Sequence, residues 1–120
     1  MARVTRSCPD GHGEPDFGLT LVVRRATATM AVSGELDAAA ADRLRAVVGA
    51  ISDVPGIVNI EIDGRDVTFV DPAGLRALLL TRVDAQLAGV SWNLASSSTA
   101  LRRLLDLAGV PEALADPALN

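Results

Sequence analysis

The sequence has no lysine or tyrosine, and it holds only one tryptophan, two phenylalanines and one cysteine. A single cysteine cannot form an internal disulfide, which fits a reducing compartment. Few aromatic side chains and a net charge of −4 disfavour nucleic acid as the partner. No apolar run reaches the ~20 residues of a membrane-spanning helix, and the N-terminus lacks the apolar centre of a signal peptide. We therefore expect a soluble, cytoplasmic protein with no direct membrane insertion.

The sequence also offers little catalytic or metal-binding chemistry. Cys8, Asp10 and His12 form the one cluster with metal-ligand side chains, and no second ligand pair accompanies them. The charged run at residues 63–66 could act in acid–base chemistry, but no histidine or nucleophile lies beside it, so we interpret it as a solvated loop. The sequence therefore predicts no metal, no cofactor and no enzymatic activity.

Nearly half of the 120 residues are hydrophobic, which suffices for the core of one domain. Residues 1–16 contain proline and glycine breaks and few apolar side chains, so we expect a flexible N-terminal tail. We place the domain at residues 17–114 and a C-terminal tail at residues 115–120.

Apolar periodicity and turn residues predict an α/β fold with the order β-β-α-β-α-β-α. Strands alternate with helices after the first hairpin, which implies right-handed crossovers and a mixed sheet of four to five strands with helices mainly on one face. The predicted strands are 19–24, 27–33, 57–62 and 90–95, a further extended segment is 67–70, and the predicted helices are 38–50, 72–88 and 99–108.

The most informative feature is a junction at which an extended apolar run becomes a helix without a spare residue. Asp71 is a predicted N-cap, and Pro72 suits the first helical position because its missing N–H costs nothing there. Asp37 is a second predicted N-cap after another strand. Such junctions suit phosphate chemistry or partner docking, yet residues 71–75 carry no hydroxyl.

Two segments resemble the STAS domain of bacterial anti-sigma factor antagonists. Residues 32–37, Val-Ser-Gly-Glu-Leu-Asp, are similar to the family's Gly-Glu-Leu-Asp signature. Residues 67–75, Val-Thr-Phe-Val-Asp-Pro-Ala-Gly-Leu, are similar to its Asp-Ser-Ser/Ala-Gly-Leu motif, and residues 104–110 resemble its final helix. The order of elements matches over residues 17–114.

The resemblance implies a partner-switching module in transcription regulation. Its partner would be an anti-sigma factor that is also a serine-protein kinase, and the binding surface would include Asp37, Asp71, Pro72, Ala73, Gly74 and Arg76. In that family the kinase phosphorylates the Ser or Thr directly after the motif Asp, and the added charge weakens the complex.

Proline stands at this acceptor position, so Pro72 cannot be phosphorylated. Thr68 is the nearest upstream hydroxyl and the remaining substitute, but it is predicted to lie in the strand or its lead-in loop. The sequence thus predicts a binding surface without the usual phosphorylation switch. An alternative is a STAS accessory subunit of an ABC-type lipid transporter or a small-ligand sensor module, and whether the protein forms a homodimer stays open.

Overall fold

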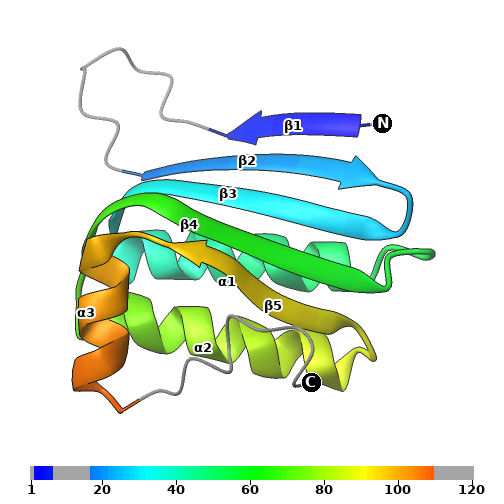
Figure 1. Cartoon of the computed structure of the whole chain (residues 1–120). Coiled ribbons are helices and arrows are strands. Elements are labelled where there is room, and N and C mark those ends of the chain that lie inside the picture. The colour runs from blue at the N-terminus through cyan, green and yellow to red at the C-terminus, as the bar shows by residue number, and fades with distance from the viewer. Residues whose placement is uncertain (1, 7–16, 110–120) are drawn as a thin grey trace.

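The computed structural model describes residues 2–6 and 17–109. Five strands form one mixed sheet in the order β1-β2-β3-β4-β5, and three helices follow β3, β4 and β5 (Figure 1). The strands are β1 (Ala2–Arg6), β2 (Phe17–Arg24), β3 (Thr27–Leu36), β4 (Asn59–Val70) and β5 (Ser91–Ser97), and the helices are α1 (Ala38–Ser52), α2 (Pro72–Leu87) and α3 (Thr99–Leu107).

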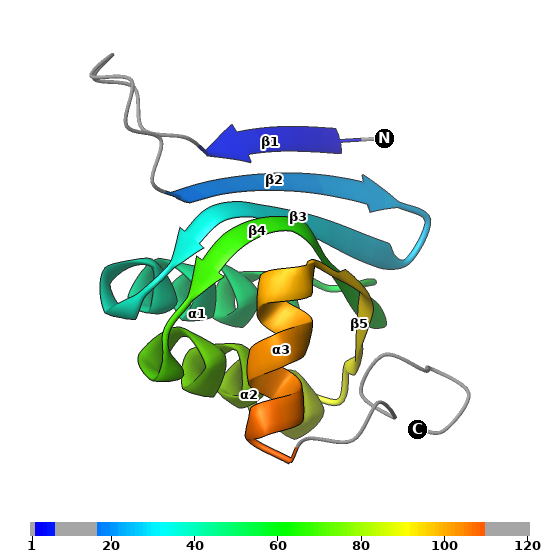
Figure 2. The same ribbon diagram turned by 60° about the vertical axis from the view of Figure 1, so that its left-hand side comes forward.

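The predicted fold class and the order of the elements from β2 onward are confirmed. β1, β2 and β3 pair antiparallel, whereas β3, β4 and β5 pair parallel. Two successive crossovers run in the same direction along the sheet, which places α1 and α2 on the same face (Figure 1). The helix α3 packs against β4, β5 and α2 (Figure 2).

The core lies between the sheet and the α1–α2 layer. Alternate residues of β3 and β4 point into it, including Met30 and Ile62, as the two-residue period of a strand requires. From α1, Leu44, Val48 and Ile51 enter the same core at helical spacing. Asp84 of α2 accepts hydrogen bonds of 3.0 and 3.1 Å from Arg45 across the outside of the two helices.

Two sequence expectations differ from the structure. Residues 2–6 lie in the segment expected to be a flexible tail, but they form strand β1 beside β2. Residues 63–66 were expected to be a loop, but they continue β4, because the strand takes up an extra residue at a shift of register opposite 31–33 and pairs again at Asp66. The expected tail at 115–120 lies outside the described residues.

Strand β3 also runs further than the expected 27–33. It continues through Gly34, whose φ of +83° is open to glycine and costly for most other residues. A second shift of register against β4 lies between Gly34 and Glu35. The strand therefore delivers Leu36 and Asp37 to the edge of the sheet where β4 also ends.

Candidate functional site

Two strand-to-helix junctions lie side by side at the carboxyl edge of the sheet. Leu36, the last residue of β3, is in register with Val70, the last residue of β4. Asp37 then caps α1 by accepting a 3.0 Å hydrogen bond from the Ala40 N–H. Asp71 caps α2 in the same way, and its Oδ1 accepts from the Gly74 N–H at 2.7 Å. Both predicted N-caps are confirmed, and parallel pairing sets the two helix N-termini next to each other.

The backbone joins the two junctions directly. The Asp71 N–H donates a 3.3 Å hydrogen bond to the carbonyl oxygen of Leu36. Gly74 in the first turn of α2 lies so close that a Cβ built on it would overlap with the same oxygen. The two motifs that stand apart in the sequence thus form a single packed unit, and glycine is required where they touch.

The surface of this unit holds most of the residues predicted to bind a partner. Pro72, Ala73 and Arg76 are exposed, whereas Asp37 and Asp71 are partly buried. Gly74 is buried, so it shapes the junction rather than lining its outer surface. Pro72 is the first residue of α2, as expected, and its extended neighbour Asp71 suits a residue that precedes proline.

An apolar groove of about 510 Å³ between α2 and α3 begins at Pro72. The described residues that line it are mostly aliphatic, with one basic side chain, and they are Pro72, Leu75, Arg76, Leu79, Leu80, Val83, Leu104, Leu107 and Ala108. Val83 and Leu107 are 44% and 84% exposed, which leaves an apolar rim at the protein surface. The spread of apolar residues over more than one stripe of α2 signals this groove in the sequence.

An exposed aromatic side chain lies beside the helix starts and was not predicted from the sequence. Phe69 is 49% exposed and stands opposite Glu35, which is also exposed, at the ends of β4 and β3. An aromatic side chain two residues before the capping Asp71 extends the candidate surface beyond the helix start. The alternation of residues along the strand does not predict this exposure, because the shifts of register change which residues face outward.

Thr68 is exposed on β4 and lines a polar pocket at the start of α3 together with Arg65, Ser98 and Arg103. Ser98 itself caps α3, accepting from the Leu101 N–H at 3.1 Å. The structure thus groups Thr68 with the residues around the start of α3.

Asp63, the first residue of the charged run at 63–66, links β4 to β5. Asp63 accepts hydrogen bonds from the Ser96 hydroxyl at 2.6 Å and from the Arg65 backbone and side chain at 3.1 Å. Burial raises the pKa of Asp63, but these hydrogen bonds and the charge of Arg65 outweigh burial and hold the pKa below its ordinary value. Within residues 2–6 and 17–109, the hydrogen bonds of Asp63 to Ser96 and Arg65 thus hold the sheet together and give no sign of a ligand site.

No group of three or more metal-ligating side chains occurs within residues 2–6 and 17–109. Cys8, Asp10 and His12, the cluster considered from the sequence, lie outside the described residues. Over the described part of the chain, no helix combines the length and apolarity needed to cross a membrane.

Comparison with protein families decides the family. The model of the STAS domain matches residues 19–116, which is most of the chain. The chain belongs to the STAS domain family. None of the curated proteins searched matches it.

Solved structures agree with this fold. The anti-sigma factor antagonist SpoIIAA in its unphosphorylated form is 22% identical, with a TM-score of 0.65 over 77% of this chain and 81% of that one. An anti-sigma factor antagonist from Mycobacterium paratuberculosis is 23% identical, with a TM-score of 0.70 over 91% and 87% of the two chains. A sulfate transporter family protein from Wolinella succinogenes is 27% identical, with a TM-score of 0.63 over 78% and 75%.

Within this STAS domain, the Gly-Glu-Leu-Asp segment and the Asp-Pro-Ala-Gly segment are the two junctions described above. The contact between Leu36 and Gly74 explains in physical terms why the two segments belong together. The STAS fold is therefore present together with both of the helix starts that the sequence singled out.

Proposed function

We propose that this STAS domain binds an anti-sigma factor of the serine-kinase type and thereby regulates sigma-factor-dependent transcription in a bacterial cytoplasm. The observation that carries the proposal is the packed pair of helix starts, at which Asp37 and Asp71 cap adjacent helices. Anti-sigma factor antagonists among the structural neighbours support it.

The proposed docking surface combines the exposed start of α2 with an apolar groove. Pro72, Ala73 and Arg76 offer an exposed face next to the capping carboxylates. The groove between α2 and α3 continues this face and can bury apolar side chains of a partner. Such a combination suits a protein partner better than a small polar substrate.

A binding experiment tests the docking surface. The tagged protein should capture an anti-sigma factor kinase from its native cell, and the purified pair should bind with a measurable Kd. Ala73→Arg should weaken binding at least tenfold, because the new side chain stands in the middle of the proposed surface. Gln86→Arg, at the other end of α2 and also exposed, is the matched control. Equal affinities of the two variants would show that the partner does not bind at the start of α2.

We further propose that the usual phosphorylation switch is absent. Pro72 occupies the first position of α2 and has no hydroxyl, so binding should persist in the presence of the kinase and ATP. Intact mass spectrometry after incubation should show no added phosphate, whereas Pro72→Ser should gain one phosphate and lose affinity through the added negative charge. Stoichiometric phosphate on the unaltered protein, at Thr68 or elsewhere, would contradict this part of the proposal.

The alternative is an accessory role in an ABC-type lipid transporter or in ligand sensing. The resemblance to a sulfate transporter family protein supports a transport-related role of this general kind. The same capture experiment separates the two functions, because recovery of a nucleotide-binding transport subunit in place of an anti-sigma factor would support the alternative.

A further inference from the structure

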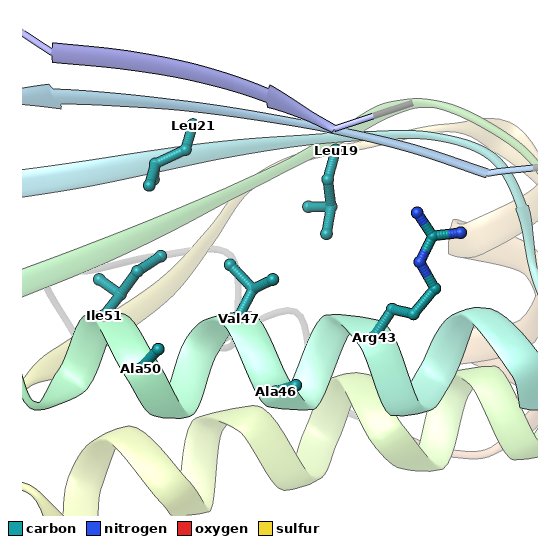
Figure 3. A pocket seen from close by; sticks show the side chains of 7 residues that line it. All are labelled: Leu19, Leu21, Arg43, Ala46, Val47, Ala50 and Ile51. Atoms are coloured by element: carbon teal, nitrogen blue, oxygen red, sulfur yellow. The ribbon is translucent and has the colours of Figure 1, made fainter. Parts of the chain in front are cut away.

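A second apolar cavity lies away from the helix starts, between β2 and α1. It has a volume of about 420 Å³, within the range of ~300–1,000 Å³ that is typical of small-molecule sites. Figure 3 shows Leu19 and Leu21 pointing from β2 toward α1, with Val47 and Ile51 pointing back from the helix. We call this cavity the β2–α1 cleft.

The cleft exists because small residues stand where larger ones would close it. Ala46 and Ala50 lie four residues apart on α1, along the same side of the helix, and both are exposed. Leu21 and Val47 are only partly buried, so apolar surface remains open to a ligand. The cleft does not open into the hydrophobic core, because Leu44 and Val48 of the same helix are fully buried there.

One charged residue marks an end of the cleft. Arg43 lies at the end nearer Leu19 (Figure 3), and its guanidinium lies 5.5 Å from the centre of the Phe17 ring. Among the described residues, Arg43 has no ion-pair partner. The described residues that line the cleft include no Asp or Glu. The stacking on Phe17 holds the positive charge beside the apolar walls.

We propose that the β2–α1 cleft binds a single-chain anionic amphiphile. Its alkyl chain lies between β2 and α1, and its carboxylate or phosphate pairs with Arg43. The length fits this occupant, since Arg43 to Ile51 spans about 12 Å of helix at ~1.5 Å per residue. A protein side chain would fill only part of that length, and a neutral molecule would leave the Arg43 charge without a counterpart.

Calorimetry on the full chain tests the proposal with octanoate, decanoate, decyl phosphate, decanol and inorganic phosphate, all below their micelle concentrations. Decanoate or decyl phosphate should bind with one-to-one stoichiometry. Decanoate should bind about 16-fold more tightly than octanoate, because each buried CH₂ contributes a factor of about four. Whichever of the two decyl anions binds more tightly identifies the headgroup. Inorganic phosphate alone should not bind.

Three variants locate the ligand. Arg43→Gln should weaken decanoate binding about tenfold and leave decanol binding unchanged, because only the charged headgroup is affected. Ala50→Leu should weaken both ligands at least tenfold by filling the cleft, and Ala46→Leu is a second filling variant if the first does not fold. Arg24→Gln removes an exposed arginine at the end of β2 and is the control.

The proposal is overturned if neither decyl anion shows saturable binding, if decanol binds as tightly as decanoate, or if both filling variants bind normally. Binding only to vesicles of anionic lipid would also overturn it, since that result requires no cleft. So would concentration-dependent self-association that covers Leu21 and Val47, because a second copy would then be the occupant. None of these outcomes bears on capture of an anti-sigma factor through Ala73.

Discussion

The contact between Gly74 and Leu36 yields a prediction whose sign is opposite to the general rule for helices. Replacing glycine with alanine inside a helix normally stabilises it by up to about 1 kcal/mol. Gly74 lies in the first turn of α2, and a Cβ there would overlap with the Leu36 carbonyl oxygen. That oxygen belongs to the backbone of β3, so it cannot move aside as a flexible side chain would.

The magnitude follows from what must shift. Overpacking of this kind costs about 1–3 kcal/mol or more. Moving the start of α2 away from β3 also strains the 3.3 Å hydrogen bond from Asp71 to Leu36, which contributes about 0.5–1.5 kcal/mol. Against these costs stands a gain of at most about 1 kcal/mol. We expect Gly74→Ala to lower the free energy of unfolding by about 2 kcal/mol.

Gly49 provides the matched control. It lies within α1, and a Cβ built on it has no other side chain or distant backbone atom within 4 Å. Gly49→Ala should therefore raise the free energy of unfolding by about 0.5–1 kcal/mol. Urea unfolding followed by circular dichroism at equal m-values measures both changes. A Gly74→Ala protein as stable as the unaltered one would refute the close packing of the two junctions.

Two further predictions concern side-chain hydrogen bonds to strand β5. The pKa of Asp63 is lowered in the folded state, so its contribution to stability is present above the ordinary aspartate pKa and is lost as pH falls toward the folded pKa. Asp63→Asn should therefore make the loss of stability between about pH 5 and 3 less steep. Urea midpoints measured across this pH range test the prediction, and an equally steep loss in the variant would contradict it. Thr81→Val should lower the free energy of unfolding by about 1–3 kcal/mol, because the buried Thr81 hydroxyl accepts a hydrogen bond from the Trp92 indole N–H at 3.1 Å and donates one to the Leu78 carbonyl oxygen at 2.6 Å. Thermal unfolding measures this change, and an unchanged Tm would show that the two hydrogen bonds do not stabilise the fold.

The sequence predicted those features that depend on local chemistry. Asp37 and Asp71 each cap the helix that was expected to follow them. Capping involves a side chain and backbone only three residues away, so the pattern is visible in the sequence. The strand-helix order followed in the same way from apolar spacing, and it sufficed to indicate the sheet and its crossovers.

Features that depend on distant partners were not visible. β1 becomes a strand only because β2 offers it an open edge, and five residues carry too little pattern to reveal that. The run at 63–66 stays in β4 because β3 pairs with it across a shift of register and because Asp63 accepts a hydrogen bond from Ser96 of β5, 33 residues away. The β2–α1 cleft likewise depends on the spacing between two elements, which no single segment encodes.

At the helix start at Asp71, the residues that shape the junction differ from the residue that would carry a phosphate in the proposed function. The junction is shaped by Gly74, by the Asp71 cap and by the hydrogen bond to Leu36, none of which needs a hydroxyl. Pro72 keeps the first helical position while it removes the acceptor for phosphate. Because different residues set the shape and carry the hydroxyl, we expect Pro72→Ser to create a phosphate acceptor without changing the shape of the proposed docking surface. The proposed docking surface and the proposed absence of a phosphorylation switch therefore depend on different residues, and each can be tested without the other.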